Sequence, residues 1–137
     1  MVESGDCVLC KVVDGELPSM KVYEDESFLS ILDVSPCAEG HCLVVPKEHV
    51  TRFYDMDDEE LAHLFRVVKV VARRVRQAFN PDFVCVFIRG GRIPHLHVAV
   101  FPSTRADSVS GFPQSSLGTA TVDLHSVAAR LSAAATV

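Results

Sequence analysis

One long amphipathic helix constrains the fold more than any other feature, and the sequence predicts it over residues 58–79. Asp57 lies before its first turn and Glu60 three residues further on, which is the spacing of a capping box, and Asn80-Pro81 ends it. Apolar residues recur at helical spacing along one side, at Leu61, Leu64, Phe65, Val68, Val71, Val75 and Phe79. The opposite side carries Arg66, Lys69, Arg73 and Arg76. We interpret the basic side as solvated and expect the apolar side to be covered by other elements.

Short apolar segments separated by turn residues predict about five strands, over 21–25, 27–32, 41–45, 83–88 and 94–101. Strands joined by short turns favour antiparallel pairing, so we predict an α+β domain whose sheet packs on the long helix. A short helix over 7–15, with Asp6 as N-cap and Gly15 as its stop, precedes the sheet. A loop rich in Ser, Thr and Gly over 103–121 leads to a C-terminal helix over 122–134.

Composition limits the classes of protein that remain. The chain has 137 residues, of which 48% are hydrophobic and 23% charged, and this fits one well-packed domain over 1–137. A net charge of -5 with no densely basic stretch argues against a nucleic-acid groove. Since we find no membrane-spanning apolar run and no signal-peptide pattern, we expect a cytoplasmic protein. Five cysteines without an export signal favour metal ligation or buried thiols over a disulfide framework.

Two histidines, His95 and His97, lie in the strand predicted over 94–101. Because a strand repeats its side-chain direction every second residue, we expect them and Ala99 on one face and the apolar residues between them on the other. Same-face positions are roughly 6 to 7 Å apart, so two imidazoles can serve one small site. Two imidazoles without partners would be costly to bury, and their spacing therefore indicates a functional site.

A second candidate site contains Cys7 and Cys10. These two thiols can join His49 and one of the strand histidines in a tetrahedral zinc site, because thiolate and imidazole are the ligands that zinc prefers. Two other interpretations stay open. A redox pair is one, although such motifs follow a strand and here no strand precedes the cysteines. A pair of buried thiols is the other.

Asp33 and Arg92 are candidates for ligand contacts. Asp33 ends an apolar strand, where it either accepts hydrogen bonds from ligand hydroxyls or begins the turn before Pro36. Arg92 lies in the glycine turn 89–92, and its guanidinium suits a phosphate group. A solvated hairpin turn is the alternative for both arginines of that turn.

Three stretches together resemble the histidine triad (HIT) family of nucleotide hydrolases and transferases. They are residues 28–36, residues 40–49, and His95-Leu96-His97 with Pro102, and the resemblance spans roughly 7–102. The family signature is His-φ-His-φ-His-φ-φ, where φ is apolar. The resemblance implies a homodimeric α+β domain with a five-stranded antiparallel sheet and a long helix.

The resemblance also implies roles for individual residues. His97 matches the histidine that attacks the α-phosphate and forms a nucleotidyl-histidine intermediate, which water then resolves. Asp33 matches the acidic residue that binds the ribose hydroxyls. His41 is a weaker candidate for the same pocket, and a core histidine at the start of a strand is the alternative. The ligands of zinc-bearing members match Cys7, Cys10, His49 and His95. The implied ligand is a purine nucleotide such as AMP or a dinucleoside polyphosphate.

The chain departs from the signature at Ala99, which occupies the third histidine position of the substrate pocket. Its methyl group cannot donate a hydrogen bond to a phosphate oxygen, and losing one transition-state donor typically costs roughly 10² to 10³ in rate. We therefore expect a weakened phosphohydrolase or nucleotidyltransferase acting on a dinucleoside polyphosphate or nucleoside phosphoramidate. A catalytically poor nucleotide-binding or sensing module is the main alternative. A zinc-stabilised structural domain that binds no nucleotide is the third.

Overall fold

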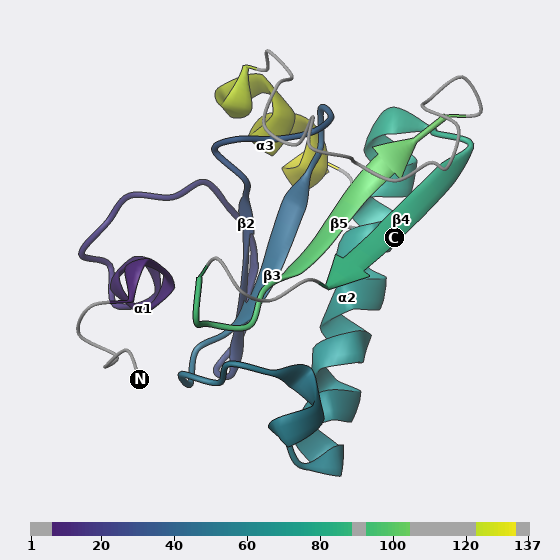
Figure 1. The fold of residues 1–137 in the computed structure, drawn as a ribbon. Coiled ribbons are helices and arrows are strands. Elements are labelled where there is room, and N and C mark those ends of the chain that lie inside the picture. The colour runs from purple at the N-terminus through teal and green to yellow at the C-terminus, as the bar shows by residue number, and fades with distance from the viewer. Residues whose placement is uncertain (1–6, 89–92, 105–122, 134–137) are drawn as a thin grey trace.

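The computed structural model of the protein describes residues 7–88, 93–104 and 123–133. In this part of the chain the helices are α1 (Val8–Val13), the 3-10 helix η2 (Phe53–Asp55), α2 (Asp58–Phe79) and α3 (Leu124–Ala133). The strands are β1 (Lys21–Glu24), β2 (Phe28–Leu32), β3 (Cys42–Pro46), β4 (Phe83–Ile88) and β5 (Val98–Ser103). They form one antiparallel sheet in the order β1-β2-β3-β5-β4, which confirms the predicted α+β architecture (Figure 1).

The long helix α2 begins and ends where the sequence predicts. The Asp57 carboxylate accepts a hydrogen bond from the Glu60 amide at 2.8 Å, and Asn80 closes the helix in the left-handed conformation at φ 47°. The buried residues of its apolar side are Leu64, Val67, Val68, Val71 and Val75. Phe65 was expected on that side but is 42% exposed. It follows Leu64 by one residue, a turn of about 100°, which carries it out of the buried stripe.

Alternate residues of the strands face two separate cores. The core on the side of α2 and α3 contains Phe28, Leu32, Val44, Val98 and Val100. The core on the side of α1 contains Leu29, Ile31 and Val45, with Leu43 packed against it. Among the described residues, this second core draws its strand residues from β2 and β3 alone, and Figure 1 shows α1 beside β2 and far from β4. On the α1 side of the sheet, the part formed by β5 and β4 therefore extends beyond α1.

Strand β5 begins later than predicted, at Val98, and runs on to Ser103. Val98 is the first residue of β5 to pair with either neighbouring strand, whereas the Leu96 amide donates to the carbonyl of Val50 at 2.6 Å. His95 and His97 therefore lie in an irregular segment before the strand, and the prediction that strand geometry puts them on one face is wrong. Ala99 does lie in β5.

Both terminal helices begin later than predicted, at Val8 and Leu124, and α1 also ends earlier, at Val13. The N-cap of α1 is Cys7, whose Sγ accepts a hydrogen bond from the Cys10 amide at 3.4 Å, and the proposed cap Asp6 lies outside the described residues. Gly15 follows α1 at φ 81°, as expected of a helix stop. Most of the loop predicted over 103–121 also lies outside the described residues. Within the described ranges, no helix combines the length and apolar character needed to span a bilayer.

Candidate functional site

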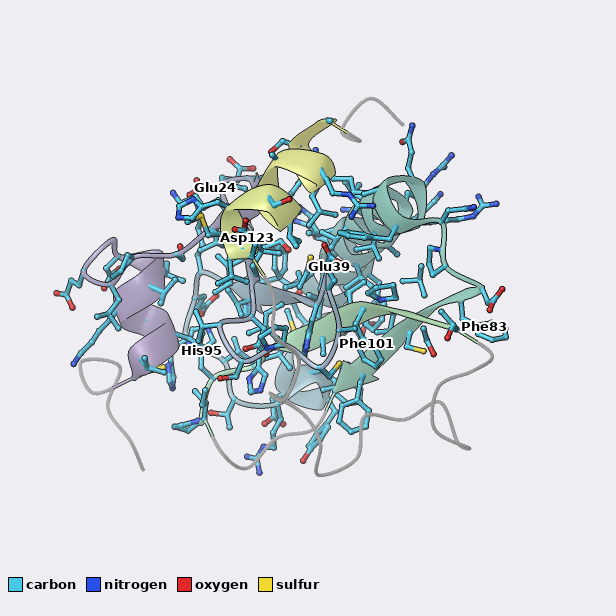
Figure 2. The ribbon with its side chains drawn as sticks, turned by 90° about the horizontal axis from the view of Figure 1, so that it is seen from above. Glu24, Glu39, Phe83, His95, Phe101 and Asp123 are labelled. Atoms are coloured by element: carbon cyan, nitrogen blue, oxygen red, sulfur yellow. The ribbon has the colours of Figure 1, made fainter. Side chains whose placement is uncertain are left out.

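Four side chains from distant parts of the sequence meet between α1 and the sheet. They are Cys7, Cys10, His49 and His95, and the atoms that could bind a metal all lie within 4.8 Å of one another. The Sγ atom of Cys10 lies 3.1 Å from Nδ1 of His49 and 3.4 Å from Nδ1 of His95. The Sγ atom of Cys7 lies 3.4 Å from the same His95 nitrogen. Figure 2 shows His95 beside α1.

The surroundings of His95 fix which of its nitrogens faces the thiols. Its Nε2 lies 2.8 Å from the carbonyl oxygen of Pro46, and because a carbonyl only accepts, Nε2 carries the proton. Burial, with smaller contributions from His49 and His97, lowers the pKa of His95, although the bond to Pro46 opposes this. The ring is therefore neutral at pH 7, with the Nδ1 lone pair directed at the sulfurs, as metal ligation requires.

The chemistry of this cluster suits zinc better than a redox pair. Two thiols and two imidazoles make an S₂N₂ donor set, which matches tetrahedral zinc. Without a cation, burial and the neighbouring Cys7 raise the pKa of the Cys10 thiol to about 11. A catalytic redox cysteine instead needs a lowered pKa, because the thiolate is the reactive form. A bound cation would reverse this preference and stabilise the thiolates.

His97 is held in one tautomer by the backbone. Its Nδ1 lies 2.8 Å from the carbonyl oxygen of His95 and therefore donates to it. The neutral ring then has an unprotonated Nε2, and the side chain is only partly buried. A part-exposed imidazole with a free Nε2 lone pair is able to act as a nucleophile. The metal-type cluster and this potential nucleophile share one residue, since His95 provides the carbonyl.

Asp33 and His41 lie at the other end of the same face of the sheet. The Asp33 carboxylate accepts a hydrogen bond from the Ser35 amide at 2.8 Å through Oδ1, so it does begin the turn. Its Oδ2 lies 3.5 Å from Nε2 of His41, which is 2% exposed. Burial lowers the pKa of His41, against the attraction of the Asp33 charge. His41 is consequently neutral at pH 7.

The register of the sheet places these residues relative to one another. Leu32 pairs with Cys42 and Cys42 with Val100, so Asp33, His41 and Phe101 are neighbours across three adjacent strands. The rings of His41 and Phe101 are 5.5 Å apart, and Figure 2 shows Phe101 on β5. Within β5, Phe101 lies three residues, or roughly 10 Å, beyond Val98, and His97 lies just before Val98. The Asp33 carboxylate therefore lies near Phe101, and the His97 imidazole lies near the start of β5.

Ala99 lies between these two positions. It pairs with Leu43 on one side and with Phe87 on the other, and it is 9% exposed. Its methyl group adds only apolar surface at the centre of the site. Arg92, the remaining candidate for substrate contacts, lies outside the described residues.

Two backbone atoms of the site could not be recognised from the sequence. The carbonyls of Pro46 and His95 set the tautomers of His95 and His97, respectively. Any residue carries a carbonyl, so neither atom leaves a signal in the amino-acid pattern. The only indirect sign is the two-residue spacing of the histidines, which lets the His97 ring reach back to the preceding carbonyl.

Comparisons with known proteins identify what this chain is similar to. The family model of the HIT domain matches residues 14–106. The protein hit of Bacillus subtilis is 36% identical over 102 residues, which cover 71% of this chain and 70% of that protein. The adenosine 5′-monophosphoramidase of Schizosaccharomyces pombe is 37% identical over 92 residues, covering 67% and 66%. The crystal structure of a Zn-bound histidine triad family protein from Mycobacterium smegmatis aligns with a TM-score of 0.80, 32% identity and coverage of 97% and 95%.

Proposed function

This chain belongs to the histidine triad (HIT) family, and we propose that it is a nucleotide hydrolase or nucleotidyltransferase with His97 as its nucleophile. Its substrate is a nucleoside phosphoramidate or a dinucleoside polyphosphate, attacked at the α-phosphate. The observation that carries the proposal is the bond from His97 Nδ1 to the His95 carbonyl, because it leaves Nε2 free to attack. The phosphoramidase activity in the name of the Schizosaccharomyces pombe relative supports this choice of substrate class.

The proposed reaction has two displacements. In the first, the Nε2 lone pair of His97 forms a bond to the α-phosphorus while the bond from phosphorus to the leaving amine or phosphate oxygen breaks. The leaving group keeps that electron pair, and a leaving amine takes up a proton from solvent. The imidazole ring then carries a positive charge, and its Nδ1–H donates to the His95 carbonyl, which stabilises that charge. In the second, water attacks the phosphorus and loses a proton to solvent. The bond to Nε2 breaks with its electron pair returning to that nitrogen, and the nucleotide leaves.

Asp33 binds the ribose in this proposal. Its carboxylate lies at the far end of the face from His97, and a charged acceptor suits two adjacent hydroxyl donors. Phe101 lies beside His41 at the Asp33 end, and Ala99 lies between Phe101 and the start of β5. A nucleoside monophosphate, with its hydroxyls at one end and its phosphate at the other, fits that order of groups.

Cys7, Cys10, His49 and His95 would hold a zinc ion. Their donor set and the orientation of His95 fit the metal, and the zinc in the Mycobacterium smegmatis relative supports the assignment. Zinc bound there would supply structural bonds rather than a reaction step. Those bonds would fix His95, and with it the carbonyl that orients His97.

A binding or sensing module with little turnover is the second candidate, and Ala99 favours it. A methyl group offers no donor to the phosphate oxygens in the transition state, whereas ground-state binding through Asp33 does not need one. We also propose a homodimer of cytoplasmic location, with no nucleic-acid partner. The exposed apolar side chains of the edge strand β4 support the dimer: Phe83 is 49% and Val86 45% exposed.

A single-turnover assay with adenosine 5′-phosphoramidate tests the proposed activity. We expect AMP release by the native chain and none by His97→Ala. Equilibrium dialysis with AMP on both proteins accompanies the assay. Retained AMP binding without release in the native chain would favour the binding module, and release that survives in His97→Ala would exclude His97 as the nucleophile.

A further inference from the structure

We propose that His41 is a positioning residue: its Nε2–H orients the Asp33 carboxylate toward the ribose hydroxyls of the nucleotide, and His41 itself does not touch the substrate. This inference rests on the proposed function, since it takes the ligand to be a ribonucleotide. It gives His41 a different role from direct substrate binding, which the sequence suggested. The reasons are the tautomer of the ring, its burial and its distance from Asp33.

The tautomer of His41 follows from one backbone contact. The Cys37 amide donates to Nδ1 of His41 at 3.0 Å, so Nδ1 is an acceptor and carries no proton. The neutral ring must then carry its proton on Nε2. A carboxylate oxygen lies near that nitrogen, namely Oδ2 of Asp33, at an Nε2–Oδ2 distance of 3.5 Å.

The Nε2 atom has no hydrogen-bond partner within the described ranges of the chain, although it is buried. Buried N–H groups are almost always paired, because leaving one unpaired costs stability. The distance of 3.5 Å is somewhat longer than a good hydrogen bond. Bonds in functional sites are often long without ligand and tighten when it binds. A small rotation of the Asp33 carboxylate toward His41 would complete this one.

The second carboxylate oxygen of Asp33 is already fixed. The Ser35 amide donates to Oδ1 at 2.8 Å, so a bond from His41 to Oδ2 would hold the carboxylate at both oxygens. Each oxygen of a carboxylate has a further lone pair, and those remaining acceptor positions are free for two hydroxyl donors. His41 is 2% exposed and packs against the Phe101 ring at 5.5 Å. It therefore acts on the ligand through Asp33.

A purely structural role makes a different prediction. His41 also closes the loop that follows β2, because its amide donates to Ala38 at 3.1 Å and its carbonyl accepts from the Asp33 amide at 3.0 Å. If His41 served that loop alone, replacing its side chain would weaken the binding of every nucleotide equally. The proposed role instead predicts a loss confined to ligands that carry ribose hydroxyls.

The test measures dissociation constants for AMP and 2′,3′-dideoxy-AMP by titration calorimetry. His41→Asn keeps an acceptor for the Cys37 amide but lacks the distal donor, whereas His41→Gln places a donor near the native Nε2. We expect His41→Asn to weaken AMP binding about tenfold and dideoxy-AMP binding less than twofold. His41→Gln should recover most of the AMP affinity. In an Asp33→Ala background, His41→Asn should change neither constant further.

Each contrary result has its own meaning. An equal loss of affinity for both ligands, or no loss of affinity for AMP, would overturn the positioning role of His41. Neither result would count against the proposal that the native chain binds nucleotides. A native chain that binds neither ligand would refute the proposed function and this inference with it. Long-range ¹H–¹⁵N spectra of the ligand-free protein test the premise without any nucleotide. They should show His41 protonated at Nε2, and protonation at Nδ1 alone would refute the inference even if variants fail to fold.

Discussion

Two backbone carbonyl groups determine which ring nitrogen carries the proton in His95 and in His97. The Pro46 carbonyl holds the His95 proton on Nε2, and the His95 carbonyl holds the His97 proton on Nδ1. The two rings consequently have their lone pairs on different nitrogens. His95 directs its Nδ1 lone pair at the thiols, and His97 has its lone pair on Nε2. A change in the backbone at His95 would disturb both. This coupling would connect the proposed metal site to the proposed nucleophile two residues away.

The missing donor at Ala99 gives the first prediction. Ala99→His should raise the single-turnover rate of AMP release from adenosine 5′-phosphoramidate by roughly 10² to 10³, because it restores a donor to the phosphate oxygens. Ala99→Leu is the control, since it adds bulk without a donor. An unchanged rate in Ala99→His would mean that the pocket has a different shape and would favour the binding module.

The stability of helix α1 depends on its contacts with the rest of the molecule. It has six residues, and a helix of that length is not stable by itself. Its contacts are the core formed with β2 and β3 and the cluster of cysteines and histidines. If the cluster holds zinc, the metal links α1 to the segment before β5.

Elemental analysis of protein purified without added metal tests the zinc site. We expect one zinc per chain, lost in Cys7→Ser together with a fall in Tm of roughly 5–10 °C, because a metal that binds only the folded state stabilises it. Cys85→Ser is the matched control, since Cys85 lies in β4 outside the cluster, and it should keep the metal. A native protein that folds without metal would refute the site.

A second link between elements joins the β1–β2 turn to α2. The Asp25 carboxylate accepts from the amides of Ser27 and Phe28, from the Tyr23 hydroxyl and from His63 on α2. Burial by itself would raise the pKa of Asp25, but these hydrogen bonds outweigh it and hold the pKa at about 2. The unfolded chain binds this proton more readily, so the stabilisation is complete above pH 3.8 and is lost as the pH falls toward 2.

Urea unfolding measures the contribution of Asp25. At pH 7, Asp25→Asn should lower the free energy of unfolding by about 2 kcal/mol, the value that corresponds to a pKa lowered from 3.8 to about 2. Between pH 4 and pH 2 the variant should lose less stability than the native chain. Glu16→Gln, at an exposed carboxylate, is the control. Equal loss of stability by Asp25→Asn and the native chain over that range would contradict the account.

At the scale of the whole molecule, the edge strand β4 is the surface best suited to a second copy. Among the described strands it pairs with β5 alone, and its sequence is apolar throughout. Long apolar edges are rarely left uncovered, because they template further strand pairing. We therefore expect light scattering to give a dimer mass for the native chain. Val86→Lys should give a monomer, and a native monomer at micromolar concentration would contradict the dimer.

How far the sequence predicted the molecule depended on whether the determining contacts were local. The Asp57 cap and the end of α2 at Asn80 depend on neighbouring residues, and both were predicted. The start of β5 depends on the bond from Leu96 to the distant Val50 carbonyl, and it was missed. Helical periodicity predicted that Phe65 is buried. Which edge of the apolar side of α2 is covered depends instead on the position of the sheet.

The same distinction holds at the site. The motifs named all four side chains of the metal-type cluster, and the structure brings them together. The carbonyls that set the histidine tautomers carry no side-chain signal, and the contact from Cys37 to His41 is a backbone contact as well. Residue types therefore indicated which groups take part, and only the backbone geometry showed which nitrogen of each ring is free.

The most direct test of the central claim is to trap the covalent intermediate on His97. The native chain is mixed with excess adenosine 5′-phosphoramidate, quenched in alkali to preserve a phosphorus–nitrogen bond, and digested for mass spectrometry. We predict one adenylyl group, carried by the peptide that contains His97 and absent in His97→Ala. An adenylyl group on another residue, or AMP release with no adduct at any time during the first turnover, would contradict it.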